Sequence, residues 1–319
     1  MKISYIMLLW VMILSILMAF SSSSLIFLWM CLEINMMSFI PVLNSKTTLS
    51  INSTVIYFII QALASSLFIF IMTIFLMNNT LFMYMKELFT CTMLLKLGAA
   101  PFHSWFPQIS EGINLTSFFL LTTIQKMIPF YVISLFFSKM IFLTILCSTI
   151  FGSLGGFNQT SFRKLLAFSS ITHMAWMLSL ILMNNLWILY LLIYSIIMGM
   201  IIKTMFQFNM NFVFQIKNLN KIDSLYLIVI LLSLGGLPPM MGFFMKWMTL
   251  KMIILNKMSI LIIPLISSSL VNLYFYTRMI YPILLKSFNF NMWNTKSFNK
   301  LNLYLITNLI FIFFLIPMM

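Results

Sequence analysis

The sequence predicts an all-helical integral membrane protein, and three observations lead to that fold class. Of the 319 residues, 62% are hydrophobic and 7% are charged, and the mean hydropathy is +1.09. Apolar stretches of about 20 residues, the length of a membrane-spanning helix, follow one another along the whole chain. Most basic residues lie between these stretches. A soluble domain of this composition would expose large apolar areas to water.

The apolar stretches predict about eleven transmembrane helices. Their approximate bounds are 3–20, 25–43, 54–77, 81–108, 115–137, 140–157, 162–183, 186–209, 224–250, 258–283 and 302–318. The longest polar segment, Lys286–Lys300, is too short to form a core of its own. We therefore expect residues 1–319 to form a single membrane domain.

The charge of the chain is strongly basic, with 18 Lys and Arg against 4 Asp and Glu. Such an excess fits nucleic acid, anionic lipid or the orientation of loops across a membrane, and the apolar background excludes nucleic acid. With eleven spans, the N-terminal side receives Lys2, Lys46, Arg163, Lys164, Lys217, Lys221, Arg278, Lys286, Lys296 and Lys300, and the other side receives mainly Lys86, Lys139, Lys251 and Lys257. By the positive-inside rule, the N-terminus is predicted to face the cytoplasm or an organelle matrix.

Two of the predicted spans contain helix breakers near their middle. The first break falls at Gly98 and Pro101; the second is marked by Gly235, Gly236, Pro238 and Pro239. Proline removes a backbone donor and clashes with the preceding turn. Broken backbone at membrane depth survives only where it is buried in protein or lines a hydrated cavity. One interrupted span in each half of the chain indicates half-helices around an ion pathway, and simple packing kinks are the alternative.

Four ionisable residues lie well inside apolar spans: Glu33, Lys96, Lys126 and Lys246. Each costs about 2.5 to 3.5 kcal/mol at the centre of a bilayer. Glu33 therefore needs a cationic partner from another helix, and we expect Lys96. A nearby carboxylate favours a charged lysine while burial opposes the charge, so the four residues form a plausible proton relay. The alternative is that the lysines extend to the headgroups.

The remaining polar side chains offer no conventional enzyme chemistry. His103 and His173 are possible relay members, although a lone histidine is more often a packed core residue. Cys31, Cys91 and Cys147 lie in apolar segments without metal-ligand spacing and are expected to fill the core. No Gly-rich phosphate loop, activated nucleophile or redox ligand cluster is present. We expect no cofactor and no metal in this chain.

The motifs together resemble one family. They are Trp29, Glu33 and Asn35 near the start, Leu95–Pro107, Gln125-Lys126, Gly155–Thr160 running into Arg163–Met174, Gly235–Phe243, and Lys246-Trp247. In order and spacing they are similar to chain 2 of mitochondrial NADH:ubiquinone oxidoreductase (respiratory complex I), an antiporter-like subunit. The richness in Met and Phe is typical of invertebrate mitochondrial genomes, which are AT-rich and read an extra Met codon.

The resemblance implies an antiporter-like fold with two inverted repeats, each with a broken helix, and an N-terminus in the matrix. It implies a proton path through Glu33, Lys96, Lys126 and Lys246 in a multi-pass protein of the mitochondrial inner membrane. NADH, FMN, iron–sulfur clusters and ubiquinone would lie elsewhere in the assembly. The implied partners are other membrane-arm subunits and phospholipids, with cardiolipin as a candidate, and protons are the transported species. The chain is expected to lack about three N-terminal helices of bacterial relatives.

Two other functions remain open from the sequence. A subunit of a multi-subunit cation/proton antiporter would share the lysine-bearing broken helices. An inert scaffold between membrane subunits would leave the four intramembrane charges unexplained.

Overall fold

The protein is helical throughout the part that can be described. The computed structural model describes residues 2–45, 47–77, 82–183, 186–218, 221–238 and 240–287. Over these ranges an isolated bridge between Ser161 and Phe212 is the one β-type contact. By length and composition, seven helices among the described residues are able to cross a membrane. The all-helical membrane fold class is confirmed, whereas the total of eleven spans and the side of the N-terminus stay predictions. The span predicted at 302–318 lies outside the described residues.

The helices follow the predicted apolar stretches closely. They are α1 (Lys2–Ser21), α2 (Leu25–Leu43), α3 (Thr48–Met77), α4 (Phe82–Leu97), α5 (Trp105–Gly112), α6 (Leu115–Thr122), α7 (Ile124–Leu135), α8 (Met140–Gly156), α9 (Phe162–Met183), α10 (Trp187–Gln207), the 3-10 helix η2 (Val213–Asn218), α11 (Lys221–Gly235), α12 (Met241–Leu255), the 3-10 helix η3 (Ser259–Leu261) and α13 (Ile262–Ser287).

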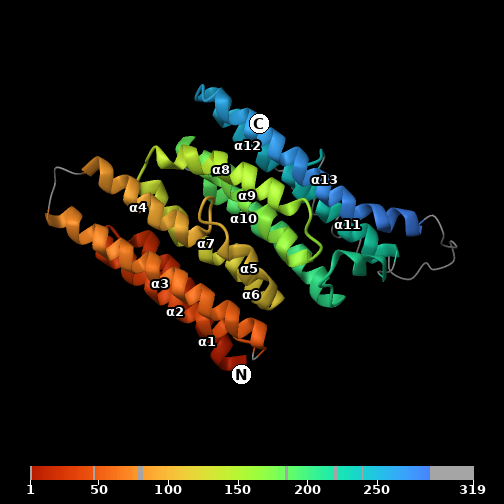
Figure 1. Cartoon of the computed structure of the whole chain (residues 1–319), viewed down its shortest axis with the longest axis horizontal. Helices are drawn as coiled ribbons and strands as arrows, with labels where there is room; N and C mark the ends of the chain where they lie inside the picture. Colours follow the sequence, from red (N-terminus) through yellow and green to blue (C-terminus); the bar gives the residue numbers. More distant parts are fainter. Residues whose placement is uncertain are drawn as a thin grey trace.

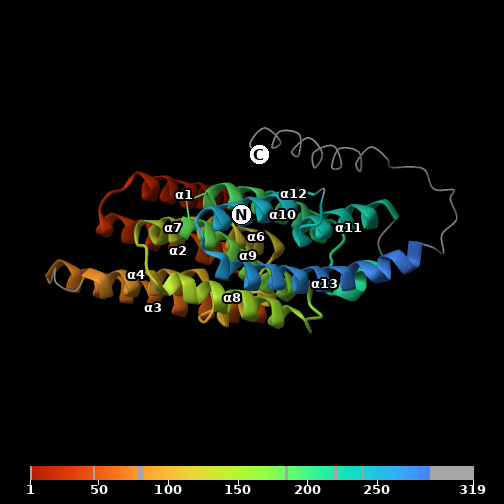
Figure 2. The ribbon, with the colours of Figure 1, turned by 90° about the horizontal axis from the view of Figure 1, so that it is seen from above.

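The helices are arranged side by side in an elongated bundle. In Figure 1 the chain passes from α1, α2 and α3 on one side, through α4 to α10 in the middle, to α11, α12 and α13 on the other side. Figure 2 places α9 between α10 and α12 above and α8 and α13 below. In an 18-residue apolar stretch of α9, 89% of the residues are buried, a larger share than in any other candidate span. Its side chains therefore contact protein on all sides.

The chain leaves the helical conformation at both predicted breaks. Helix α4 ends at Leu97, and Gly98 takes a φ of +67° before α5 begins. Helix α11 ends at Gly235, and Gly236 takes a φ of +79° before α12 begins. A positive φ costs an L-residue about 1–2 kcal/mol, which explains glycine at both positions. The predicted breaker Pro239 lies outside the described residues.

A third interruption corrects the prediction of one continuous helix over 115–137. The backbone of Thr123 has φ −120° and ψ −76°, and it separates α6 from α7. The hydroxyls of Thr122 and Thr123 both donate to the Phe119 carbonyl, at 3.0 and 2.7 Å. Threonine hydroxyls that bond back to the preceding turn bend helices. The stretch carries neither Gly nor Pro at this point, so the usual sequence signal was missing.

The contact between α11 and α12 gives a first testable prediction. A methyl group on Gly242, in the first turn of α12, would collide with the carbonyl oxygen of Ser233 on α11. We expect Gly242→Ala to force these helices apart and to lower the free energy of unfolding by roughly 1–3 kcal/mol. The control is Gly199→Ala on α10, where the nearest atom is a Phe119 ring carbon at 3.5 Å. Thermal unfolding of the purified protein measures both, and equal melting temperatures would contradict the packing.

Candidate functional site

The first helix break is stabilised by neutral side chains from other helices. The indole Nε1 of Trp105, on α5, donates to the Leu95 carbonyl at 3.2 Å. The side-chain amide of Gln61, on α3, donates to the Lys96 carbonyl at 3.1 Å. A buried carbonyl left without a hydrogen bond costs about 1–3 kcal/mol. Helices α3 and α5 therefore fix the end of α4 that carries Lys96.

The second helix break is stabilised by a charged side chain. The ammonium Nζ of Lys246, on α12, donates to the Gly235 carbonyl at 2.7 Å. This carbonyl belongs to the last residue of α11, where the helix dipole places partial negative charge. Lys246 is 7% exposed, so its side chain does not extend to the headgroups. The hydrogen bond therefore fixes the end of α11, and it also keeps the Lys246 ammonium at the break.

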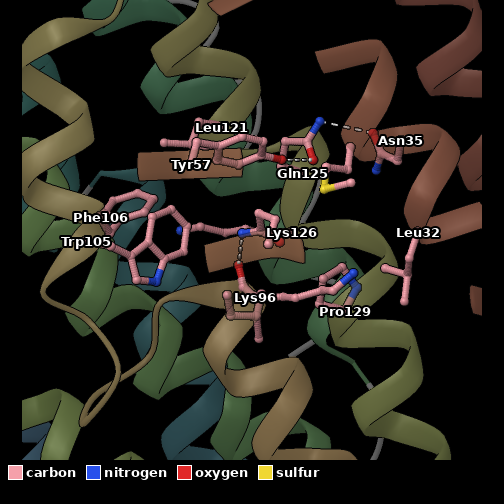
Figure 3. A pocket seen from close by; sticks show the side chains of 13 residues that line it. Leu32, Asn35, Tyr57, Lys96, Trp105, Phe106, Leu121, Gln125, Lys126 and Pro129 are labelled. Atoms are coloured by element: carbon pink, nitrogen blue, oxygen red, sulfur yellow. Dashed lines mark hydrogen bonds between the residues drawn. The ribbon is translucent and has the colours of Figure 1, made fainter. Parts of the chain in front are cut away.

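Two of the predicted lysines line the same cavity. Lys96 from α4 and Lys126 from α7 both line an empty space of about 410 Å³. Its other polar lining residues are Asn35, Tyr57, Gln61, Trp105 and Gln125. Figure 3 shows these side chains converging from several helices. About 20 Å³ of this space can hold the centre of a water molecule. Since about 10–15 Å³ suffices for one water, the cavity has room for a water molecule beside the lysines.

Lys126 is the most deeply buried of the intramembrane charges. It is 2% exposed, and its Nζ has no hydrogen-bond partner within the described ranges. The Nζ lies 5.3 Å from the ring centroid of Phe106 and 5.7 Å from that of Tyr194. Aromatic faces attract a cation, but they do not accept its three N–H bonds in full. The amine is therefore held between rings and stays open to a further polar partner.

A hydrogen-bonded glutamine joins the cavity walls next to Lys126. The Gln125 amide Nε2 donates to Asn35 Oδ1 at 3.0 Å, and the Tyr57 hydroxyl donates to Gln125 Oε1 at 3.2 Å. These bonds connect α7 to α2 and α3. Asn35 is two residues from Glu33 on α2, so the same helix presents the acid and anchors the glutamine.

Glu33 lies within electrostatic range of Lys96. Its carboxylate attracts the positive charge of the Lys96 ammonium. Over the described ranges, however, the two side chains do not form an ion pair of 4.0 Å or less. Glu33 is half-buried, whereas Lys96 is 7% exposed. The acid expected to be the partner of Lys96 is thus near it but not in direct contact, and small movements of α2 or α4 change their interaction.

His173 connects the two halves of the site. It lies on the buried helix α9, is 1% exposed, and interacts electrostatically with both Lys126 and Lys246. Its Nδ1 lies 2.8 Å from the hydroxyl of Tyr190 on α10, and its ring centroid lies 5.0 Å from that of Tyr194. Glu33, Lys96, Lys126, His173 and Lys246 lie, in this order along the chain, on α2, α4, α7, α9 and α12. We call these five residues the polar row.

Several buried polar atoms around His173 have no hydrogen-bond partner in the described part of the chain. They are Lys126 Nζ, His173 Nε2, Trp176 Nε1 and Asn272 Oδ1. Native proteins satisfy nearly all such groups with protein or ordered water. A cluster of this kind between Lys126 and Lys246 is typical of a hydrated interior.

The structure places other predicted residues away from the polar row. His103 is half-buried in the loop of the first break, where it stacks on Phe151 with centroids 5.2 Å apart, and it does not line the cavity. Cys31 is buried, and all three cysteines are free thiols. Over the described ranges, no group of three or more His, Cys, Asp or Glu residues could hold a metal ion.

Several residues of this site were not predicted to belong to it. Gln61 was not singled out, and Gln125 was named only as part of the Gln125-Lys126 motif, although amides inside apolar spans are rare enough to indicate both. Tyr190 and Tyr194 gave no comparable signal, because tyrosine is common in membrane helices and their spacing of four residues fits ordinary core packing.

Comparison with known proteins identifies the family. Residues 22–271 match the family described as NADH:quinone oxidoreductase/Mrp antiporter, transmembrane. The chain belongs to this family. Among its relatives is NADH-ubiquinone oxidoreductase chain 2 of Anopheles gambiae, 42% identical over 310 residues that cover 93% of this chain and 90% of the relative. The same protein of Locusta migratoria is 37% identical over 285 residues, covering 86% and 83%. The resemblance seen in the motifs is confirmed.

Solved structures of the NADH:quinone oxidoreductase/Mrp antiporter family show the same fold. A chain of respiratory complex I from Thermus thermophilus superposes with a TM-score of 0.81 at 20% identity, over 88% of this chain and 70% of that one. A chain of the Mrp complex from Dietzia gives 0.74 at 14% identity, over 88% and 59%. At such identities the likeness concerns the fold alone, and it confirms the antiporter-like architecture.

The amide that stabilises the first break gives a second prediction. Gln61→Leu would leave the Lys96 carbonyl without its donor at membrane depth. We expect a loss of stability of about 1–3 kcal/mol, measured as a lower melting temperature of the purified protein. Ser66→Ala on the same helix is the control, because its hydroxyl bonds only within α3, to the Leu63 carbonyl at 2.9 Å. A melting temperature for Gln61→Leu no lower than that of Ser66→Ala would argue against the role of the amide.

Proposed function

We propose that this chain is a membrane-arm subunit of mitochondrial complex I and conducts protons along the polar row. Membership in the chain 2 family supports the first part. The second part depends on one observation, namely three lysines buried on α4, α7 and α12 that are joined by a shared cavity and a histidine. Three buried ammonium groups, none within ion-pair distance of a carboxylate in the described part of the chain, would be costly at membrane depth in a protein that had no use for them.

The contacts of each lysine assign it a step in the proton path. Burial disfavours the charged form of Lys96 and the nearby Glu33 favours it, so the distance between α2 and α4 controls the balance between the two effects. The shared cavity provides space for water between Lys96 and Lys126. His173 then lies between Lys126 and Lys246. Lys246 ends the path with its ammonium on the Gly235 carbonyl.

Electron transfer takes place outside this chain in the proposed assembly. NADH, FMN, iron–sulfur clusters and ubiquinone belong to other subunits of complex I. Their redox chemistry reaches the polar row through movement or a change of charge, because a shift of α2 alters the Glu33–Lys96 interaction directly. The chain thereby contributes to proton translocation driven by quinone reduction.

The proposed setting is the mitochondrial inner membrane, with the N-terminus in the matrix. The partners are neighbouring membrane-arm subunits and phospholipids, cardiolipin among them. We propose that residues 1–319 form one antiporter-like domain. The chain spans 70% of the Thermus thermophilus chain that it matches.

The two alternative functions account for less of the structure. A subunit of a cation/proton antiporter shares the fold with the Mrp chain, but the curated relatives at 37% and 42% identity are both named as chain 2 of the oxidoreductase. A scaffold would require no cavity shared by two buried lysines.

The Glu33–Lys96 interaction gives a third prediction. Glu33→Gln and Lys96→Met each remove one charge, and we expect proton pumping coupled to quinone reduction to fall by roughly tenfold or more while assembly is largely kept. Pumping is measured in vesicles with NADH and ubiquinone, and assembly by NADH-oxidising activity of the native complex that contains the chain.

Glu111→Gln is the matched control for these variants. Glu111 forms an ion pair of 2.8 Å with Lys164, at the end of α5 and away from the polar row. We expect it to pump like the wild type. Full pumping by assembled Glu33→Gln and Lys96→Met would instead favour a scaffold. Absence of the chain from the NADH-oxidising complex would disprove the proposal that the chain is a subunit of complex I.

A further inference from the structure

The His173–Tyr190 contact leaves a choice between two arrangements of hydrogen. Either the Tyr190 hydroxyl donates to Nδ1, or a protonated Nδ1 donates to the phenol oxygen, since 2.8 Å suits both. The choice decides which ring nitrogen of His173 carries the proton, because a neutral imidazole has one donor and one acceptor.

The surroundings of Tyr190 favour donation by its hydroxyl. Tyr190 is 1% exposed, and His173 Nδ1 is the hydrogen-bond partner of its hydroxyl within the described ranges. A buried O–H without an acceptor is costly. If Nδ1–H donated instead, the phenol hydrogen would need another acceptor, and none of the described side chains provides it. The hydroxyl therefore donates, and Nδ1 accepts.

We infer that Tyr190 is a positioning residue that holds His173 in the Nε2–H tautomer and directs Nε2 toward the proton path. This inference rests on the relay role proposed above for His173. Nε2 is buried and has no partner in the described part of the chain, so it is the nitrogen left to exchange hydrogen bonds with the path. Tyr190 itself touches neither lysine by a hydrogen bond and acts through His173.

The neighbouring charges keep the imidazole of His173 neutral, and this is why its tautomer matters for the proton path. Lys126 from α7 and Lys246 from α12 both act electrostatically on His173. The tilted ring of Tyr194 from α10 lies with its centroid 5.0 Å from that of His173. Tyr276 from α13 interacts electrostatically with Tyr190 and Tyr194. Two cations disfavour a third positive charge on the imidazole. A neutral ring has defined donor and acceptor ends, and only a fixed tautomer keeps the same end toward the path in every cycle.

A double-mutant cycle in the assembled complex tests this inference. The variants are Tyr190→Phe, His173→Gln and the double variant, with Tyr131→Phe as a control because its hydroxyl bonds only to the Phe20 carbonyl at 3.4 Å. We expect Tyr190→Phe to lower coupled proton pumping about two- to tenfold, the effect of one lost hydrogen bond, and to shift its pH profile. We expect Tyr131→Phe to pump like the wild type with an unchanged pH profile.

The double variant separates a positioning role from an independent one. If Tyr190 acts through His173, the double variant pumps no worse than His173→Gln alone. Multiplied losses, or a wild-type rate and pH profile for Tyr190→Phe, would overturn the inference while leaving the relay in place. Full pumping by His173→Gln would overturn the relay role and the inference together.

A measurement on the unaltered complex keeps the test independent of mutant folding. A high-resolution map of wild-type complex I should show the Tyr190 oxygen within hydrogen-bond distance of His173 Nδ1. A separation beyond about 3.5 Å, or contact through Nε2, would overturn the inference.

Discussion

The structure depends on one electrostatic constraint, which is that ammonium groups at membrane depth must find polar partners inside the protein. Lys96, Lys126 and Lys246 are each less than a tenth exposed. In water such a charge is hydrated on all sides, whereas in lipid it has nothing comparable. The helices around them are consequently broken, bent or polar: Lys96 and Lys126 share a cavity with two glutamine amides, and Lys246 binds the carbonyl at the end of α11.

Two of the three helix interruptions satisfy this constraint in different ways. At Gly98 the free carbonyls bind the neutral donors Gln61 and Trp105, so the end of α4 does not depend on charge. At Gly236 the carbonyl of the preceding residue binds Lys246 directly. Loss of that proton would weaken the bond and release the end of α11. The first break is therefore a rigid support, and the second is a place where protonation and backbone geometry are linked.

The sequence could predict the features that depend on composition and on breaker residues. Long apolar stretches gave the helices, Gly98 and Gly236 gave two breaks, and charges in apolar spans gave Glu33 and the three lysines. The break at Thr123 could not be predicted, because threonine bends a helix only when its hydroxyl bonds to the preceding turn. The contact of Tyr190 with His173 joins two helices, and local sequence carries no information about such pairs. The roles of the polar-row residues in proton transfer stay a prediction.

The central claim is most directly tested by a map of the assembled complex that resolves water. Lys126 Nζ lacks a hydrogen-bond partner in the described chain, and a buried ammonium cannot remain so. The account predicts ordered waters that contact Lys126 Nζ and continue toward Lys96 on one side and His173 Nε2 on the other. A dry cavity, with Lys126 turned toward lipid headgroups and no water between it and His173, would contradict the proposed proton path.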